Sequence, residues 1–143
     1  MASLLVVVEA GCDSARAVQH VIRRYRQMAM QVYLLSVQPP MHRHVSRFIS
    51  SEELKKFHEE NGMRELKPVI DRLDAAGVPH WSHVLVGPKA EEIVRFAQEC
   101  HSSQIIVAKE HAGILSKLGL GSTSSQVRQL IGASGTSAIC EDY

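Results

Sequence analysis

Several features that mark particular classes of protein are missing from this sequence, and an excess of charge is the first. The 143 residues carry 16 Lys and Arg against 15 Asp and Glu, which gives a formal net charge of +1. Proteins that bind nucleic acids usually gather many basic residues on one face, and the densest basic cluster here is only Arg23, Arg24 and Arg26. We interpret this cluster as the solvated face of a helix, and we expect no nucleic-acid partner.

Cysteine is scarce as well. The three cysteines, Cys12, Cys100 and Cys140, are an odd number and show no C-x-x-C spacing. This pattern disfavours both a disulfide framework and a structural zinc site. It favours a protein that works in a reducing compartment.

Long apolar runs are also absent. No stretch approaches the roughly 20 apolar residues that a transmembrane helix needs, so we expect no membrane partner. The first ten residues, MASLLVVVEA, lack the basic start of a signal peptide and turn polar at Glu9, which is typical of a buried strand. Together with the cysteine pattern, these absences predict a cytoplasmic protein.

What the sequence does contain is a regular alternation of strand-like and helix-like segments. Apolar runs predict strands, and apolar residues at helical spacing predict the helices between them. The expected strands are Leu4–Val8, Gln31–Val37, His80–Val86, Gln104–Lys109 and Thr136–Cys140. The expected helices are Ala17–Ala29, with four to five turns, Glu53–Ala76, Ala90–Cys100 and Ser124–Ile131. No linker interrupts this order, so residues 1–143 are predicted to form a single domain.

The segment between the second and third strands needs separate interpretation. Met41–Ser50 shows no clear period and is predicted to be a loop. Ser50 and Glu53 have the spacing of a capping box, which predicts a helix start. Gly62 and Pro68 interrupt the helical pattern that follows, so we expect one kinked helix or two pieces.

Strands that alternate with helices predict an α/β fold, a three-layer, doubly wound, five-stranded parallel sheet with four helices. Ligands of such folds bind beyond the carboxyl ends of the strands, at the point where the strand order reverses. The first and fourth strands are expected to flank that point. The loops Glu9–Asp13 and Lys109–Ser122 should then face each other across one crevice.

The stretch Ile105–Ser124 combines a strand, a glycine-bearing loop and the start of a helix. Such an arrangement can direct backbone N–H groups at an anion, and Ser122 and Ser124 would add hydroxyl groups. Lys117 and His111 could supply positive charge or hydrogen bonds. In the alternative interpretation Gly119 and Gly121 only ease a tight turn, and one of the serines is an N-cap. The residues leave both interpretations open.

The same segments resemble the universal stress protein family, in order and over essentially the whole chain. LVVVEAG (Leu5–Gly11) is similar to the family's opening strand and turn, and LLSV (Leu34–Val37) resembles its second strand. VGPKAEEI (Val86–Ile93) is similar to its turn into the third helix, and QIIVAKEH (Gln104–His111) stands at its fourth strand. The resemblance implies the universal stress protein fold, of the adenine nucleotide alpha hydrolase-like type.

The resemblance also implies where a nucleotide would bind. The family's nucleotide-binding branch carries G-x2-G-x9-G-[S/T] after the fourth strand, and this chain keeps Gly121 and Ser122 but has Ala108 and His111 at the two earlier glycines. Those glycines let the backbone approach phosphates closely, so the replacements predict weak or absent ATP binding. The family's strand-one Asp, near the ribose and base, is here Glu9. The candidate cofactor-binding residues are Glu9, Val37, His111, Gly119, Gly121, Ser122 and Ser124, of which Val37 rests on the resemblance alone.

Two classes of function follow. The first is a non-enzymatic stress-response module that is dimeric through its last strand, as the resemblance implies, and that binds ATP weakly or not at all. The alternative is an ATP- or AMP-binding stress protein, or one that binds another small anion, with the loop after the fourth strand as phosphate site. No catalytic residues are expected, because no G-x-S-x-G nucleophile motif is present. No metal site is expected, because His42 and His44 lack an acidic or cysteine partner nearby.

Overall fold

The computed structural model describes residues 2–11, 13–41, 43–108, 123–134 and 138–143. Strands and helices alternate along these ranges, as the sequence pattern predicts. The strands are β1 (Ser3–Val7), β2 (Gln31–Gln38), β3 (Trp81–Val86), β4 (Gln104–Val107) and β5 (Ile139–Asp142). The helices are α1 (Ala15–Gln27), α2 (Arg43–Ser46), α3 (Ser51–Ala75), α4 (Lys89–Glu99) and α6 (Thr123–Ser134).

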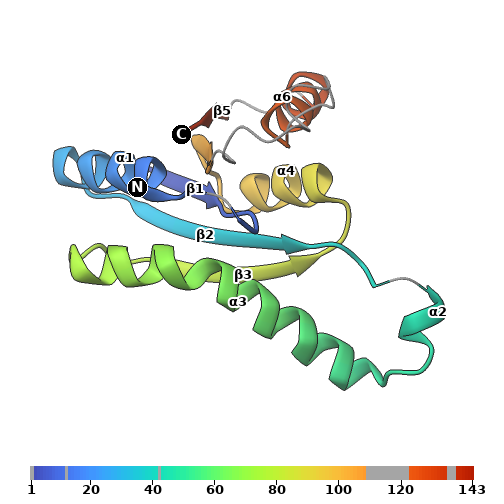
Figure 1. Ribbon diagram of the computed structural model, residues 1–143. Coiled ribbons are helices and arrows are strands. Elements are labelled where there is room, and N and C mark those ends of the chain that lie inside the picture. Colours follow the sequence, from blue (N-terminus) through green and yellow to red (C-terminus); the bar gives the residue numbers. More distant parts are fainter. Residues whose placement is uncertain (1, 12, 42, 109–122, 135–137) are drawn as a thin grey trace.

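All five strands form one parallel sheet in the order β3-β2-β1-β4-β5 (Figure 1). β1 lies in the middle, paired with β2 on one side and with β4 on the other. The chain leaves β1 toward β2 and β3 and later returns to β4 and β5 on the opposite side. The predicted α/β fold is therefore confirmed, and β1 and β4 are the neighbours that flank the reversal of strand order.

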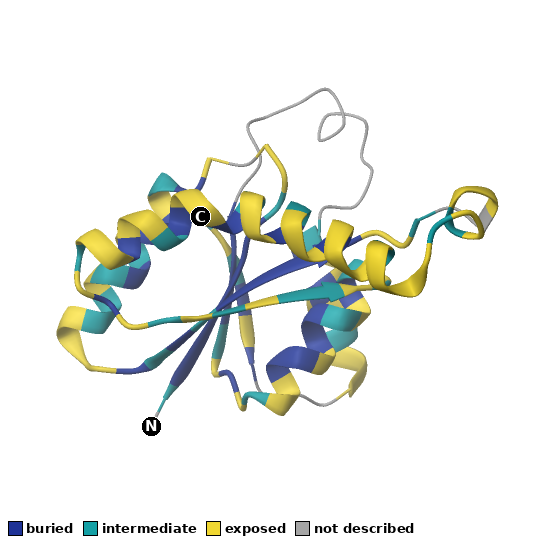
Figure 2. Cartoon of the chain, turned by 90° about the horizontal axis from the view of Figure 1, so that it is seen from below, coloured by how far each residue is buried: buried dark blue, intermediate teal, exposed yellow. Residues whose placement is uncertain are grey.

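The central strand β1 is buried on both faces, which explains why its sequence is continuously apolar instead of alternating. Leu4 and Val6 pack in a layer with apolar residues of α1 and α3. Leu5 and Val7 pack in a second layer with residues of α4 and α6. Figure 2 shows buried residues in the strands and on the helix sides that face them. Each such side chain contributes roughly 1.5–3 kcal/mol to folding, so β1 is the main anchor of the fold.

Two local predictions differ from the structure. The predicted loop Met41–Ser50 contains the helix α2, whose four residues are too few to produce a periodic pattern. α2 projects beyond the carboxyl end of the sheet (Figure 1). The first helix is also shorter than the four to five turns predicted. α1 has 13 residues, because Met28 already has extended backbone with φ −155°.

Helix α3 runs through both of the residues that were expected to interrupt it. It is a single helix of 25 residues, and its N-terminal and C-terminal halves are inclined to each other in Figure 1. Its start is the predicted cap, since the Ser50 hydroxyl accepts a hydrogen bond from the Glu53 N–H at 3.1 Å. Its end is a glycine turn at Gly77, with φ +71°, where the Val78 N–H donates to the Leu73 carbonyl.

Gly62 lets α3 lie directly against β3. A Cβ atom built at this position would lie 2.5 Å from both methyl groups of Val84. Gly62 is buried, and its place in the helix is therefore explained by the close contact between the helix and the strand. A larger residue would push the two elements apart.

We predict that Gly62→Ala destabilises the protein. In a helix interior this change usually stabilises by about 1 kcal/mol, but here the added methyl group overlaps Val84, and such overpacking costs about 1–3 kcal/mol. Urea denaturation should therefore show a lower free energy of unfolding. The matched control is Gly132→Ala in α6, where a Cβ meets nothing within 4 Å, and this variant should be unchanged or more stable.

A Val84→Ala background tests the cause of that loss. With the valine methyl groups removed, Gly62→Ala should no longer destabilise, and the two changes should be clearly non-additive. Equal losses from Gly62→Ala in both backgrounds would show that the contact between α3 and β3 is not responsible.

Within the described ranges, no helix combines the length and apolar character that spanning a membrane requires. The longest, α3, carries exposed ion pairs on its surface, such as Lys56 with Glu60 at 3.9 Å and Lys67 with Asp71 at 3.2 Å.

Candidate functional site

The candidate site lies beyond the carboxyl ends of β1 and β4, where the strand order reverses. Val7 and Val107 are the last paired residues of these two strands. The Val8 N–H continues the pairing by donating to the Leu35 carbonyl at 2.9 Å. Glu9 is therefore the first side chain beyond the sheet, and its position is set by a rigid strand.

The Glu9 carboxylate is contacted from two helix starts. Lys89, the first residue of α4, places its Nζ 3.6 Å from Glu9 Oε1. Thr123, the first residue of α6, donates a hydrogen bond from its hydroxyl group to the same oxygen. Only 16% of the Glu9 side chain is exposed. Three elements that are distant in the sequence thus meet at one carboxylate oxygen.

Sequence reasoning identified Glu9 but neither of its partners. Lys89 directly follows the Gly87-Pro88 turn, and Thr123 directly follows Gly121-Ser122. A signal for both existed, because the first residue of a helix beyond a parallel strand often lies at the ligand-binding edge.

Ser124 also lies at the start of α6, but its hydroxyl group faces β5. The side chain is fully buried and donates a hydrogen bond to Asp142 Oδ2 at 2.9 Å. Arg128, one turn later, has its NH2 atom 3.9 Å from the same Asp142 oxygen and donates from Nε to the Cys140 carbonyl at 3.0 Å. The first turn of α6 is therefore joined to β1 by Thr123 and to β5 by Ser124.

None of the other predicted site residues is seen at the Glu9 carboxylate in the described part of the chain. Val37, near the end of β2, is 4% exposed and packs in the apolar layer beneath α4. Gly119, Gly121, Ser122 and His111 lie outside the described residues, as does the whole loop Lys109–Ser122.

Ala108, which replaces one of the family glycines, is described. It is 1% exposed, and its N–H donates to the Val7 carbonyl at 3.1 Å. This backbone donor is therefore used within the sheet and does not point toward a ligand.

A cavity of about 360 Å³ opens on the α3 side of Glu9. This volume is within the usual range of small-molecule pockets. The lining residues are Val8, Glu9, Ala10, Gly11, Ser14, Arg64, Glu65 and Pro68. The cavity therefore combines two carboxylates and a guanidinium group with an apolar wall.

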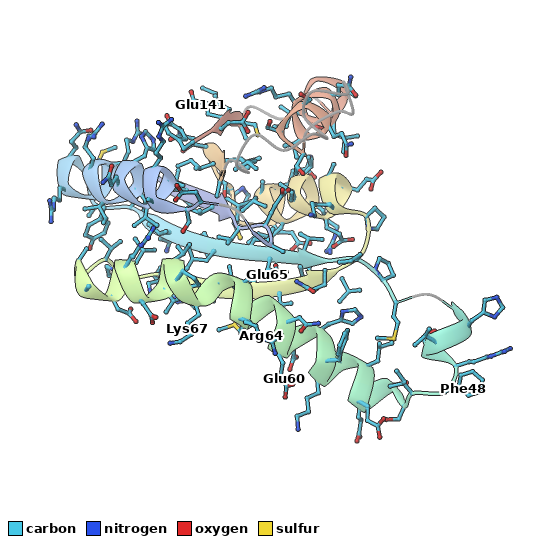
Figure 3. The ribbon with its side chains drawn as sticks, in the orientation of Figure 1. Phe48, Glu60, Arg64, Glu65, Lys67 and Glu141 are labelled. Carbon is cyan, nitrogen blue, oxygen red and sulfur yellow. The ribbon has the colours of Figure 1, made fainter. Side chains whose placement is uncertain are left out.

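A partly buried chain of hydrogen-bonded polar side chains leads from this cavity to β2. Glu65 is on the side of α3 that faces the sheet, whereas Glu60 and Lys67 point away from it (Figure 3). Glu65 Oε2 accepts a hydrogen bond from the Ser36 hydroxyl at 2.7 Å, and Gln38 Nε2 donates to the Ser36 oxygen at 2.9 Å. Sequence reasoning missed this chain, although two polar residues at the end of the apolar strand β2 were a signal for it.

The described ranges offer little for metal binding or for nucleophilic attack. No cluster of three or more His, Cys, Asp or Glu side chains suited to a metal ion is present in this part of the chain. Burial raises the pKa of the Cys140 thiol to about 11, and burial also raises the pKa of Cys100. Both thiols are therefore protonated at neutral pH, a form that is poorly nucleophilic.

Comparison with known proteins agrees with this architecture. Among solved structures, the hypothetical protein MJ0577 shares 22% identity with a TM-score of 0.74, covering 99% of this chain and 95% of that chain. A universal stress protein from Archaeoglobus fulgidus shares 22% identity with a TM-score of 0.65, covering 98% and 93%. A universal stress protein family protein from Arabidopsis thaliana with AMP bound shares 15% identity with a TM-score of 0.64, covering 99% and 92%.

These identities show a shared fold. None of the curated proteins matches the chain. The family model described as the universal stress protein family matches residues 1–131, and since this match spans most of the sequence, the chain belongs to the universal stress protein family.

Proposed function

We propose that this protein is a non-enzymatic stress-response module of the cytoplasm that binds ATP weakly or not at all. One observation carries the proposal. The carboxylate at the end of β1 is held by Lys89 and Thr123, so a nucleotide at this edge would have to displace or share contacts that the protein already makes with itself. The same contacts also occupy the Glu9 carboxylate, which could otherwise act as a general base at this edge of the sheet.

The residues after β4 support the same proposal. The N–H of Ala108 is used in the sheet, and His111 stands in the sequence where the family's nucleotide-binding branch has a glycine. Both features reduce the number of backbone donors that a phosphate group could reach.

The alternative function is binding of ATP or AMP with Glu9 and the loop after β4. The specific observation in its favour is that a relative of the same fold, the Arabidopsis thaliana protein, was solved with AMP bound. The cavity beside Glu9 is also of a size that suits part of a nucleotide.

We predict that the purified protein carries no stoichiometric nucleotide and that its dissociation constant for ATP is above about 1 mM, which corresponds to a binding free energy weaker than about −4 kcal/mol. Chromatography of the supernatant after denaturation would detect released nucleotide. Isothermal titration of the emptied protein would give the affinity. Bound nucleotide at one per chain, or micromolar affinity, would contradict the proposal and favour the alternative.

A second prediction concerns His111. The double variant Ala108→Gly/His111→Gly should bind ATP more tightly than the natural chain, and His111→Gly alone should account for most of the gain, because the N–H at position 108 is used in the sheet. Isothermal titration calorimetry measures the ATP affinity of the double variant and of His111→Gly. The control is His101→Gly, at the opposite end of β4, which should leave the affinity unchanged. If neither variant gains affinity, the imidazole is not what limits binding.

We also propose that the protein is a homodimer through β5. This strand is at one edge of the sheet, and its Ile139 side chain is 60% exposed. An unpaired edge strand with an exposed apolar side chain favours pairing with another chain. The backbone of β5 would extend the sheet across the two subunits.

We predict a mass of twice 15.8 kDa by light scattering at micromolar concentration. Ile139→Lys should shift the protein toward the monomer, because it replaces an exposed apolar side chain of the edge strand β5 with a charge. Val86→Lys introduces the same charge on β3, the opposite edge strand, and should leave the mass unchanged. A monomer mass for the natural chain would refute dimerisation through β5.

A further inference from the structure

The two groups that contact Glu9 are the kinds of group that bind anions. Lys89 supplies an ammonium group, and Thr123 supplies a hydroxyl group at the first residue of a helix with 12 residues. A helix N-terminus favours negative charge. Both groups converge on a single oxygen, Glu9 Oε1, so that oxygen marks where an oxygen of a bound anion would lie.

We propose that Glu9 is an internal competitor, whose carboxylate occupies an anion subsite formed by Lys89 and Thr123 and so lowers the affinity for phosphate groups. The inference deepens the proposed function and rests on it, because it names a cause of the weak nucleotide binding. The ligand class is a phosphate or a small phosphorylated molecule. Such a ligand gains access when the Glu9 side chain is removed or loses its charge.

Local geometry holds the carboxylate in this position. The Val8 N–H is bonded to the Leu35 carbonyl, so the backbone just before Glu9 is fixed to the sheet. The glutamate side chain is long enough to reach α4 and α6 together. The side chain is only 16% exposed, whereas Lys89 is 39% exposed. A ligand could therefore approach the ammonium group from solvent, but the oxygen position is already filled.

Because the Glu9 carboxylate is part of the chain, it competes for the subsite more effectively than a free anion would. A tethered group acts at an effective concentration that reaches millimolar values for short flexible links, and a group fixed by a strand is better placed still. The apparent affinity of an external anion falls by the fraction of molecules in which the subsite is open. The charge of Glu9 also repels an incoming phosphate, so the carboxylate opposes binding in two ways.

Asp142 provides a second carboxylate at the same helix start. It accepts the Ser124 hydroxyl at 2.9 Å and lies 3.9 Å from Arg128. Two consecutive hydroxyl groups at the beginning of α6 are thus directed at carboxylates of the chain itself. The two hydrogen bonds differ in burial. Thr123, which donates to Glu9, is partly exposed, whereas Ser124, which donates to Asp142, is fully buried.

The test is a titration with inorganic phosphate and with pyrophosphate at low ionic strength. Isothermal titration calorimetry and 31P NMR measure the binding. Glu9→Gln and Glu9→Ala should each bind pyrophosphate at least about tenfold more tightly than the natural chain. Glu9→Gln keeps the shape of the side chain and is therefore the variant less prone to misfold. Circular dichroism would check that both variants are folded. The matched control is Glu99→Gln on α4, which removes one negative charge at an exposed ion pair with Arg95 and should cause little gain.

A further variant identifies the subsite. Lys89→Met in the Glu9→Gln background should abolish the gain, because the ammonium group would no longer be present. The inference is overturned if both Glu9 variants fold and show no gain, if Glu99→Gln gains as much, or if Lys89→Met leaves the gain intact. Each of these results leaves the proposed function standing when the natural chain still ignores ATP. Micromolar ATP binding by the natural chain would instead overturn the proposed function itself.

Discussion

The burial of β1 on both faces is the constraint on which the rest of the structure depends. Leu4, Leu5, Val6 and Val7 are 0–1% exposed and hold both helix layers against the sheet. Parallel pairing with β2 and β4 fixes the strand laterally. The first polar side chain beyond this anchor, Glu9, thereby acquires a defined place between α4 and α6. The position of Glu9 is well defined because the strand before it is buried on both faces and paired on both edges.

The polar groups at the start of α6 are paired with carboxylates of the chain itself. The first turn of α6, which could receive an anion, is joined to two carboxylates of the protein, Glu9 and Asp142. These contacts connect α6 to β1 and β5 and so help to hold the helix against the sheet. In our proposal, the Glu9 contact that helps to hold α6 against the sheet is also the contact that excludes a ligand.

The fold and the position of the candidate site within it could be predicted from the sequence, because both follow from local patterns and one topological rule. Alternating apolar segments indicated the order of strands and helices, and the place of Glu9 followed from the end of β1. The partners of Glu9 were not predictable in this way, since Thr123 is 114 residues away and the contact depends on tertiary packing. Thr123 and Ser124 are adjacent in sequence but about 100° apart around the helix, so they face different strands. The short helix α2 carries too few residues for any periodic signal.

The chain formed by Gln38, Ser36 and Glu65 has a consequence for how this protein can change in evolution. Ser36 is fully buried and donates its hydroxyl hydrogen to Glu65, while its oxygen accepts from Gln38. Replacement of any one of them would leave a polar group of the others without a partner, which usually costs about 1–3 kcal/mol. Divergence at this end of β2 should therefore proceed through paired or triple replacements, and homologues that retain Ser36 should also retain a carboxylate at the facing position of α3.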